Sequence, residues 1–223
     1  MHKVFCFIFA RGGSKRIPNK NLLKINNKSL LEITLNLAKK VKKIDKIFVS
    51  SDSKKILRIA KKNNVQIIKR PKLLCSSNSN EFESWKHAID NLRKKKIIFD
   101  CFLSLPTTSP LRIKNDILKL IRKFSKSKYD LVLCATDTNR FPHYNMVVKK
   151  KNKIELIIKK SRGIKKRNIF DLTTVGYIAK PKFIMKAKSI FDGKVGYIKI
   201  PRERSIDIDD FYDLKVARLL LSK

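Results

Sequence analysis

Two clusters of charged residues, near opposite ends of the sequence, have the residue types and spacing that phosphate and metal chemistry require. The first follows a short apolar run and reads Ala10-Arg11-Gly12-Gly13-Ser14-Lys15-Arg16, continuing through Pro18 to Lys20 and Asn21. Two glycines allow a tight turn that presents backbone N–H groups, and Arg11, Lys15 and Lys20 can neutralise a triphosphate. The glycine spacing fits neither a dinucleotide fingerprint nor a Walker loop. Taken alone, the segment is equally compatible with a plain basic turn.

The second cluster is Ser205-Ile206-Asp207-Ile208-Asp209-Asp210. Strict alternation turns the isoleucines to one face and Asp207 and Asp209 to the other, just ahead of a predicted helix. Hard carboxylate oxygens on one side suit Mg²⁺ when phosphates and water supply its remaining ligands. Helix capping is the alternative for Asp209 or Asp210. Capping does not account for Asp207.

The elements that must position these clusters alternate along most of the chain. Strands are predicted at residues 4–9, 47–50, 65–69, 97–105, 130–136, 173–179 and 195–200, and helices at about 29–42, 53–63, 80–95, 114–125, 181–189 and 210–221. Strands that are apolar on both faces and alternate with helices indicate a mostly parallel sheet with crossovers. We therefore predict an α/β, doubly wound, Rossmann-like fold. The glycine-containing loop then follows the first strand, where open α/β sheets bind ligands.

One stretch breaks this rhythm. Residues 139–169 are basic and hairpin-like, with turn residues at Lys151 and Asn152. We expect a single domain, 1–223, in which this stretch is a small β-rich excursion that serves dimer contacts or acts as a lid.

The charge, the apolar runs and the cysteines of the chain narrow the classes of protein to which it can belong. The formal net charge of +36 suggests nucleic-acid binding, but the lysines are scattered over nearly every predicted element, which favours solvated faces over a binding stripe. The first apolar run is too short for a membrane span. Cys6, Cys75, Cys101 and Cys134 show no CxxC pairing and indicate reduced core residues of a cytoplasmic protein.

The segment RGGSKRIPNKNLLKI closely resembles the signature loop of the acylneuraminate cytidylyltransferases, the CMP-sialic acid synthetases, and more loosely that of the CMP-Kdo synthetases. Further matches occur in the family's order and approximate spacing: SSD at 50–52, KRP at 69–71, TSPLR at 108–112, TTVGY at 173–177 and SIDID at 205–209. Together these segments cover nearly the whole chain, so the resemblance is specific.

The resemblance implies a nucleotidyltransferase that moves CMP from CTP to the anomeric hydroxyl of a sialic-acid-like nonulosonic acid and releases pyrophosphate. It assigns catalysis to Arg11, Lys15 and Lys20 together with Mg²⁺ on Asp207 and Asp209. It assigns nucleotide binding to Ala10, Arg11, Gly12, Gly13, Ser14, Asn21 and Arg70, and sugar binding to Thr108, Ser109, Arg112 and Tyr177. It also implies a cytoplasmic homodimer with no specific nucleic-acid or membrane partner.

Several residues retain plainer interpretations. Arg70 is also compatible with a surface position before Pro71, Thr108 and Ser109 with the turn that starts a helix, and Tyr177 with a packed strand aromatic. The chain departs from the usual sialic acid synthetase pattern at Pro106-Thr107 and Thr174-Val175, and Cys75–Ser79 lacks an Asp often found there. The first two departures lie on the acceptor side. A legionaminic-, pseudaminic- or other nonulosonate-like acceptor is therefore open, as is a CMP-Kdo synthetase or another sugar nucleotidyltransferase.

Overall fold

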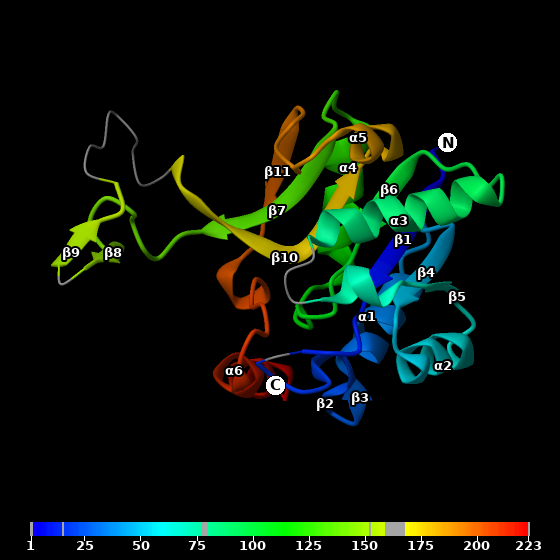
Figure 1. Ribbon diagram of the computed structural model, residues 1–223, viewed down its shortest axis with the longest axis horizontal. Coiled ribbons are helices and arrows are strands. Elements are labelled where there is room, and N and C mark those ends of the chain that lie inside the picture. The colour runs from blue at the N-terminus through cyan, green and yellow to red at the C-terminus, as the bar shows by residue number, and fades with distance from the viewer. Residues whose placement is uncertain (1, 15, 77–79, 152, 159–167, 223) are drawn as a thin grey trace.

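A seven-stranded sheet forms the centre of the chain in the computed structural model, which describes residues 2–14, 16–76, 80–151, 153–158 and 168–222 (Figure 1). Its strand order is β11-β7-β10-β6-β1-β4-β5. The strands are β1 Val4–Phe9, β4 Lys46–Ser51, β5 Gln66–Lys69, β6 Cys101–Ser104, β7 Leu131–Asp137, β10 Phe170–Ala179 and β11 Val195–Lys199. Only β10 runs antiparallel to its neighbours, β6 and β7. The predicted α/β fold with a mostly parallel sheet is confirmed.

The described residues form six α-helices, of which the first five lie between strands and the last follows β11: α1 Leu30–Lys39, α2 Lys54–Lys62, α3 Glu81–Lys94, α4 Lys114–Ser125, α5 Pro181–Lys186 and α6 Phe211–Leu221. Four of them begin at a side chain that accepts a backbone hydrogen bond, which satisfies a donor the helix itself leaves unpaired. These N-caps are Ser29, Ser53, Asn80 and Asp210. Because the caps fix where each helix starts, they also fix the loops that precede the helices at one edge of the sheet.

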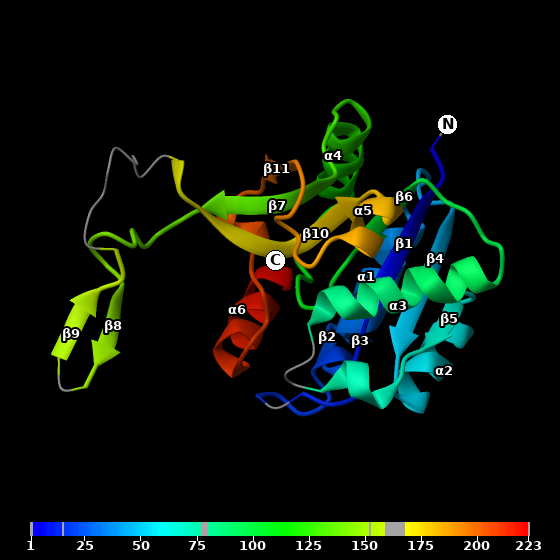
Figure 2. The same cartoon turned by 45° about the horizontal axis from the view of Figure 1, so that its top comes forward.

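The helices cover both faces of the sheet, and the alternation along β1 shows how. Cys6 and Ile8 belong to the apolar cluster under α1, α2 and α4, whereas Phe5 and Phe7 belong to the cluster under α3 and α5. Successive side chains of a strand point to opposite faces, so a central strand must be apolar throughout to serve two cores. Figure 2 shows α3 lying across one face of the sheet.

Two small hairpins lie outside the main sheet. Strands β2 Lys24–Ile25 and β3 Lys28–Ser29 pair around Asn26 and Asn27, which both have positive φ. Strands β8 Val147–Lys150 and β9 Lys153–Leu156 pair antiparallel and stand away from the sheet in both views (Figures 1 and 2). Asn152 and residues 159–167 of the predicted excursion lie outside the described residues. The division into one domain with an excursion stays a prediction.

The predicted strand at 97–105 is too long at its start. Lys96 has a φ of 57°, and the Ile97 N–H donates to the carbonyl of Leu92, so this stretch ends α3 instead of starting β6. The ring of Phe99 stacks 4.8 Å from that of Phe5, which explains the apolar character of the stretch. Across the described part of the chain, no helix has the length and apolar character that crossing a membrane requires.

Candidate active site

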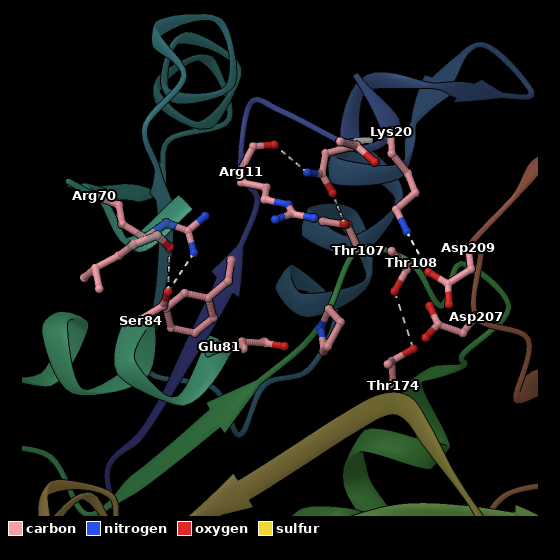
Figure 3. Close-up of a pocket in the computed structure, with 15 residues that line it drawn as sticks. Arg11, Lys20, Arg70, Glu81, Ser84, Thr107, Thr108, Thr174, Asp207 and Asp209 are labelled. Atoms are coloured by element: carbon pink, nitrogen blue, oxygen red, sulfur yellow. Dashed lines mark hydrogen bonds and ion pairs between the residues drawn. The ribbon is translucent and has the colours of Figure 1, made fainter. Parts of the chain in front are cut away.

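A pocket of about 310 Å³ opens at the edge of the sheet where β1, β5 and β6 end (Figure 3). Its walls come from six segments: the loop after β1, the loop after β5, the first turn of α3, the loop after β6, the middle of β10 and the segment before α6. The residues that line it are Phe9, Arg11, Ser14, Lys20, Asn21, Arg70, Leu74, Glu81, Ser84, Pro106, Thr107, Thr108, Thr174, Asp207 and Asp209. The carboxyl edge of a mostly parallel sheet is where such folds bind ligands.

The loop after β1 is held close to the start of α2. The Gly12 N–H donates to Asp52 Oδ1 at 2.8 Å, and a Cβ atom at Gly12 would lie 2.9 Å from Ser53 Cβ. Burial acts to raise the pKa of the Asp52 carboxyl, but the hydrogen bond from Gly12 and the nearby Arg70 charge leave that pKa below its ordinary value. The loop therefore has room only for glycine at position 12. Ala10, also predicted here, is fully buried.

Asn21 fixes the far side of this loop. Its Nδ2 donates to the carbonyl of Arg11 at 2.8 Å, and its Oδ1 accepts a hydrogen bond from Thr107. The Arg11 guanidinium donates to the carbonyl of Ser76 at 2.9 Å. Through these contacts the loops after β1, β5 and β6 share one hydrogen-bonded frame, and the Arg11 side chain lies along the pocket.

Lys20 and the two aspartates meet at one end of the pocket. Lys20 Nζ lies 3.1 Å from Asp209 Oδ1 and 2.7 Å from the carbonyl oxygen of Ile208. Arg16 Nη1 lies 3.5 Å from Asp209 Oδ2. Desolvation raises the pKa of the Asp207 carboxyl, and the charge of Asp209 raises it further. As predicted from the alternation, Asp207 and Asp209 face the same side and both line the pocket, although residues 205–209 form no strand.

The segment that carries these aspartates is tied to the body of the fold at two further points. Arg204 donates to both carboxylate oxygens of Asp116 at 3.0 and 3.1 Å, and the Asp116 side chain is 1% exposed. The Ile208 N–H donates to the carbonyl of Thr108 at 2.9 Å. Bidentate arginine–carboxylate pairs fix orientation as well as distance.

The two carboxylates suit a hard divalent cation. Asp207 Oδ1 is buried and has no hydrogen-bond partner among the described residues, which leaves an oxygen donor free in the pocket. The described residues contain no group of three or more possible metal ligands. Mg²⁺ characteristically takes one or two carboxylates and fills its octahedron with water and substrate phosphates. Asp207 and Asp209 therefore fit a metal that arrives with a phosphate-bearing substrate.

Arg70 lies at the other end of the pocket. Its side chain is 8% exposed, its Nη1 donates to Ser84 Oγ at 3.1 Å, and its guanidinium carbon lies 5.9 Å from the centre of the Phe9 ring. Glu81 stands beside it, one helical turn before Ser84 on α3. Arg70 is thus enclosed, in contrast to the surface position that its sequence context also allowed.

In the loop after β6, some residues line the pocket and others hold the loop in place. Thr108 lines the pocket, and Ser109, fully buried, lies with its Oγ 2.6 Å from Thr174 Oγ1. Arg112 is 4% exposed and donates to the carbonyls of Ser109 and Pro106, and burial lowers its pKa to about 10. Thr108 and Ser109 do not form the start of α4. There the Asp116 carboxylate accepts a hydrogen bond from the Ile113 N–H.

The predicted site residues therefore fall into three groups. Arg11, Ser14, Lys20, Asn21, Arg70, Thr108, Asp207 and Asp209 line the pocket. Ala10, Gly12, Gly13, Ser109, Arg112 and Tyr177 do not line it; Tyr177 packs with its ring 5.5 Å from that of Trp85. Lys15 lies outside the described residues.

Sequence reasoning missed Phe9, Glu81 and Ser84, which also line the pocket. The one available signal was the i, i+3 spacing of two polar residues at the start of an otherwise apolar helix face, which places both side chains on the same side of α3.

Comparison with known proteins shows the family of the chain. Residues 5–191 match the family described as Cytidylyltransferase. The chain is 29% identical to "Post-translational flagellin modification protein B" of Campylobacter coli over 100% of the chain and 97% of that protein. It is 27% identical to the CMP-N,N'-diacetyllegionaminic acid synthase of Campylobacter jejuni over 100% and 96% of the two sequences.

One solved structure with a similar fold is CMP:2-keto-3-deoxy-manno-octonic acid synthetase in complex with CTP. Its TM-score is 0.73 at 15% identity, with 99% of this chain and 98% of the other covered. At this level of identity the likeness concerns the fold. It supports the architecture derived above and leaves the acceptor open.

Proposed function

The chain belongs to the cytidylyltransferase family, and on this premise we propose that it transfers CMP from CTP to the anomeric hydroxyl of a nonulosonic acid and releases pyrophosphate. One observation carries the proposal. A single pocket holds Arg11 and Lys20 beside the carboxylates of Asp207 and Asp209, at the carboxyl edge of the sheet. Cations and a paired carboxylate site are what an in-line attack at phosphorus requires, because such reactions depend on positioning and charge neutralisation.

The residues act as follows in this proposal. The acceptor hydroxyl attacks the α-phosphorus of CTP and loses its proton, while the bond from that phosphorus to the oxygen bridging to the β-phosphate breaks. Lys20 and Arg11 neutralise charge on the phosphates, and Gly12, whose N–H is held by Asp52, keeps the tight turn that places Arg11 along the pocket. Asp207 and Asp209 would hold Mg²⁺, which stabilises negative charge on the reacting phosphate. Lys15 takes part by family resemblance.

The binding surfaces follow from this arrangement. Asn21 and Arg70, with Arg11 and Ser14, form the nucleotide side, and Ala10, Gly12 and Gly13 shape the loop that carries Arg11 and Ser14. Thr108, together with Thr174, faces the acceptor side, and Ser109 and Arg112 support it from behind, whereas Tyr177 packs against Trp85. The acceptor class is supported by the similarity to a synthase named for N,N'-diacetyllegionaminic acid. Thr107 and Thr174, the residues at which the chain departs from the sialic acid pattern, both line the pocket, so acceptor identity is the open part of the proposal.

The working form that we propose is a cytoplasmic homodimer. Apolar side chains on the hairpin β8–β9 are exposed, including Val147, Ile154 and Ile157, with 72% exposure at Ile154. A second copy of the chain is the partner that would cover them, since an exposed apolar hairpin is a natural contact surface. Cysteines that are free and mostly buried accord with a reducing compartment.

The experiment that tests the reaction measures pyrophosphate release from CTP and Mg²⁺ with N-acetylneuraminate, legionaminate, pseudaminate and Kdo as acceptors. Release with a nonulosonate other than Kdo supports the proposal and names the acceptor. Release with Kdo alone replaces it by the CMP-Kdo synthetase alternative. Activity that requires UTP or GTP refutes the nucleotide assignment.

A further inference from the structure

Glu81 is a third carboxylate in the pocket, and the proposed chemistry does not use it. It is the first residue of α3, and its Oε1 accepts a hydrogen bond from Trp85 Nε1 at 3.2 Å. It lines the same pocket as Arg70 and Asp207. In Figure 3 its side chain points into the pocket, on the same side as Ser84. The Glu81 carboxylate is therefore placed to meet a ligand bound in the pocket.

The position of Glu81 indicates which part of the nucleotide would meet it. Lys20, Asp207 and Asp209 lie at one end of the pocket, and Arg70, Ser84 and Glu81 lie at the other (Figure 3). With the phosphates and metal at the first end, the base lies at the second. Arg70 Nε is buried there without a hydrogen-bond partner among the described residues, so a donor is available for an acceptor atom of the base.

The two pyrimidines differ at one position of the edge that these side chains would meet. Cytosine carries an amino group there, which donates hydrogen bonds, whereas uracil carries a carbonyl oxygen, which accepts them. A carboxylate accepts from the amino group and repels the carbonyl oxygen. A guanidinium suits the neighbouring acceptor atoms of cytosine.

We propose that Glu81 selects cytosine over uracil by accepting a hydrogen bond from the exocyclic amino group, while Arg70 donates to the adjacent acceptor atoms of the base. This inference rests on the proposed use of CTP and adds the residue that determines the choice of nucleotide. Trp85 holds one carboxylate oxygen of Glu81, which leaves the other for the base.

The electrostatics of the pocket support this assignment. Desolvation raises the pKa of Glu81, and the charge of Asp207 raises it further, whereas the Trp85 hydrogen bond and the charge of Arg70 act to lower it. Glu81 is itself exposed to solvent, so a base that binds over its carboxylate would displace water from it. A desolvated carboxylate gains more from a hydrogen-bond donor than one in water does. A site whose polar group is paired by the correct substrate discriminates strongly against an analogue that leaves that group unpaired.

The test is calorimetric titration of the full chain with CTP and with UTP in the presence of Mg²⁺, for the native protein and Glu81→Gln. We expect the native protein to bind CTP more tightly than UTP by about tenfold or more. Gln offers both a donor and an acceptor and accommodates either base. The ratio of the two Kd values should therefore fall close to one in this variant.

Two control variants separate base recognition from a structural role. Glu83→Gln removes a carboxylate two residues away that is paired with Lys86 and does not line this pocket, and its Kd ratio should equal the native one. Trp85→Phe removes the hydrogen bond to Glu81 but keeps the carboxylate, and it should retain a clear preference for CTP. If Trp85→Phe abolished the preference as completely as Glu81→Gln, the proposed contact with the base would be wrong.

A ligand-side comparison keeps the test independent of folding effects. The triphosphate of the pyrimidin-2-one ribonucleoside lacks the 4-amino group but is otherwise CTP. The native protein should bind it more weakly than CTP, whereas Glu81→Ala should bind the two alike. If the native protein prefers CTP and Glu81→Gln keeps that preference, the inference about Glu81 fails while the proposed function stands. If the native protein binds no CTP, both fail.

Discussion

Lys20 Nζ lies 3.1 Å from Asp209 Oδ1 although the two residues are 189 positions apart in the sequence. The same ammonium donates to the carbonyl of Ile208, so one side chain joins the loop after β1 to the segment before α6. Only 16% of the Lys20 side chain is exposed. A nucleotide that enters the pocket therefore meets a cation already positioned by the carboxylate segment, and Lys20 contributes both charge and alignment.

We expect Lys20→Ala to lower kcat for pyrophosphate release by about 10²-fold or more, because a preorganised positive charge facing the reacting phosphate is lost. Lys20→Arg should recover part of the rate, since it keeps the charge. Lys24→Ala, at an exposed position of β2, is the control and should match the native enzyme. A native kcat in Lys20→Ala would show that this ammonium takes no part in the reaction.

Asp207→Asn and Asp209→Asn should each lower turnover by about 10²-fold or more at saturating Mg²⁺, with little loss of folding stability. Binding of Mn²⁺ in the presence of CTP, followed by electron paramagnetic resonance, should weaken in both variants. Asp210→Ala is the matched control, because Asp210 caps α6 and its loss should cost about 1 kcal/mol of stability but little activity. Near-native turnover in both asparagine variants would refute the metal assignment.

Gly12→Ala and Gly13→Ala form a second matched pair. A Cβ at Gly12 would lie 2.9 Å from Ser53 Cβ, whereas a Cβ at Gly13 would have no neighbour within 4 Å. We expect Gly12→Ala to raise the KM for CTP by about tenfold or more, since a small displacement of the loop misplaces the phosphates. Gly13→Ala should stay within about twofold of the native value. Equal effects of the two substitutions would contradict the tight packing inferred at Gly12.

Arg204→Ala should destabilise the fold by about 3 kcal/mol or more in urea unfolding, because it leaves the buried Asp116 carboxylate without its cation. Arg204→Lys should recover part of this loss, though not the bidentate geometry. Arg202→Ala, two residues earlier and exposed, serves as the control. A loss below about 1 kcal/mol would place the pair among weak surface ion pairs.

Glu81 should make folding stability depend on pH in a definite direction. Burial raises its pKa above the ordinary value, so the folded protein holds this proton to a higher pH than the unfolded chain does. At pH values below the pKa that Glu81 has in the unfolded chain, its contribution to stability is fully present. This contribution is lost as the pH rises through the pKa that Glu81 has in the folded protein. Because Glu81 is also exposed to water, which screens this effect, Glu81→Gln should raise the Tm at pH 7 only slightly and lose this advantage near pH 4.

The Glu81 prediction is checked by thermal unfolding of both proteins across that pH range. Glu83→Gln should show no comparable gain at pH 7, because its carboxylate lies outside this pocket and is paired with Lys86. A Tm difference for Glu81→Gln that is the same at both pH values would contradict the linkage.

Much of the fold is readable from the sequence because a central parallel strand must serve two cores. Runs such as VFCFIF at 4–9 are apolar at every position, and this marks a strand covered on both faces. Helix starts are equally readable where Ser29 or Asp210 precedes an apolar pattern. These signals are local, so no knowledge of the partner strands is needed.

Strand direction is less accessible. The side-chain period along β10 is the same whether the strand runs parallel or antiparallel, so its reversed insertion between β6 and β7 leaves no periodic signature. The stretch at Ile97–Phe99 misled for a related reason, since Phe99 packs against the sheet without joining it, while Ile98 is exposed.

The site was predictable where neighbouring residues in the sequence form a recognisable motif, as in the loop after β1 and at Asp207 and Asp209. Glu81 could not be found this way. It has no motif around it, and its place in the pocket depends on where α3 starts relative to β5 and β6. Arg112 is the opposite case. It belongs to a motif that predicts a site residue, but its guanidinium donates to the carbonyls of Ser109 and Pro106 and does not line the pocket.

The pocket draws the cations of its metal end from residues 11–20 and its carboxylate pair from residues 207–209, and this sets the order in which that end is made during translation. The basic loop leaves the ribosome almost two hundred residues before the acidic pair. A nascent or prematurely terminated chain that stops before Arg204 has the basic loop but lacks the groups that neutralise it. Such a fragment lacks the proposed metal ligands, so CTP turnover also reports that synthesis has passed this point.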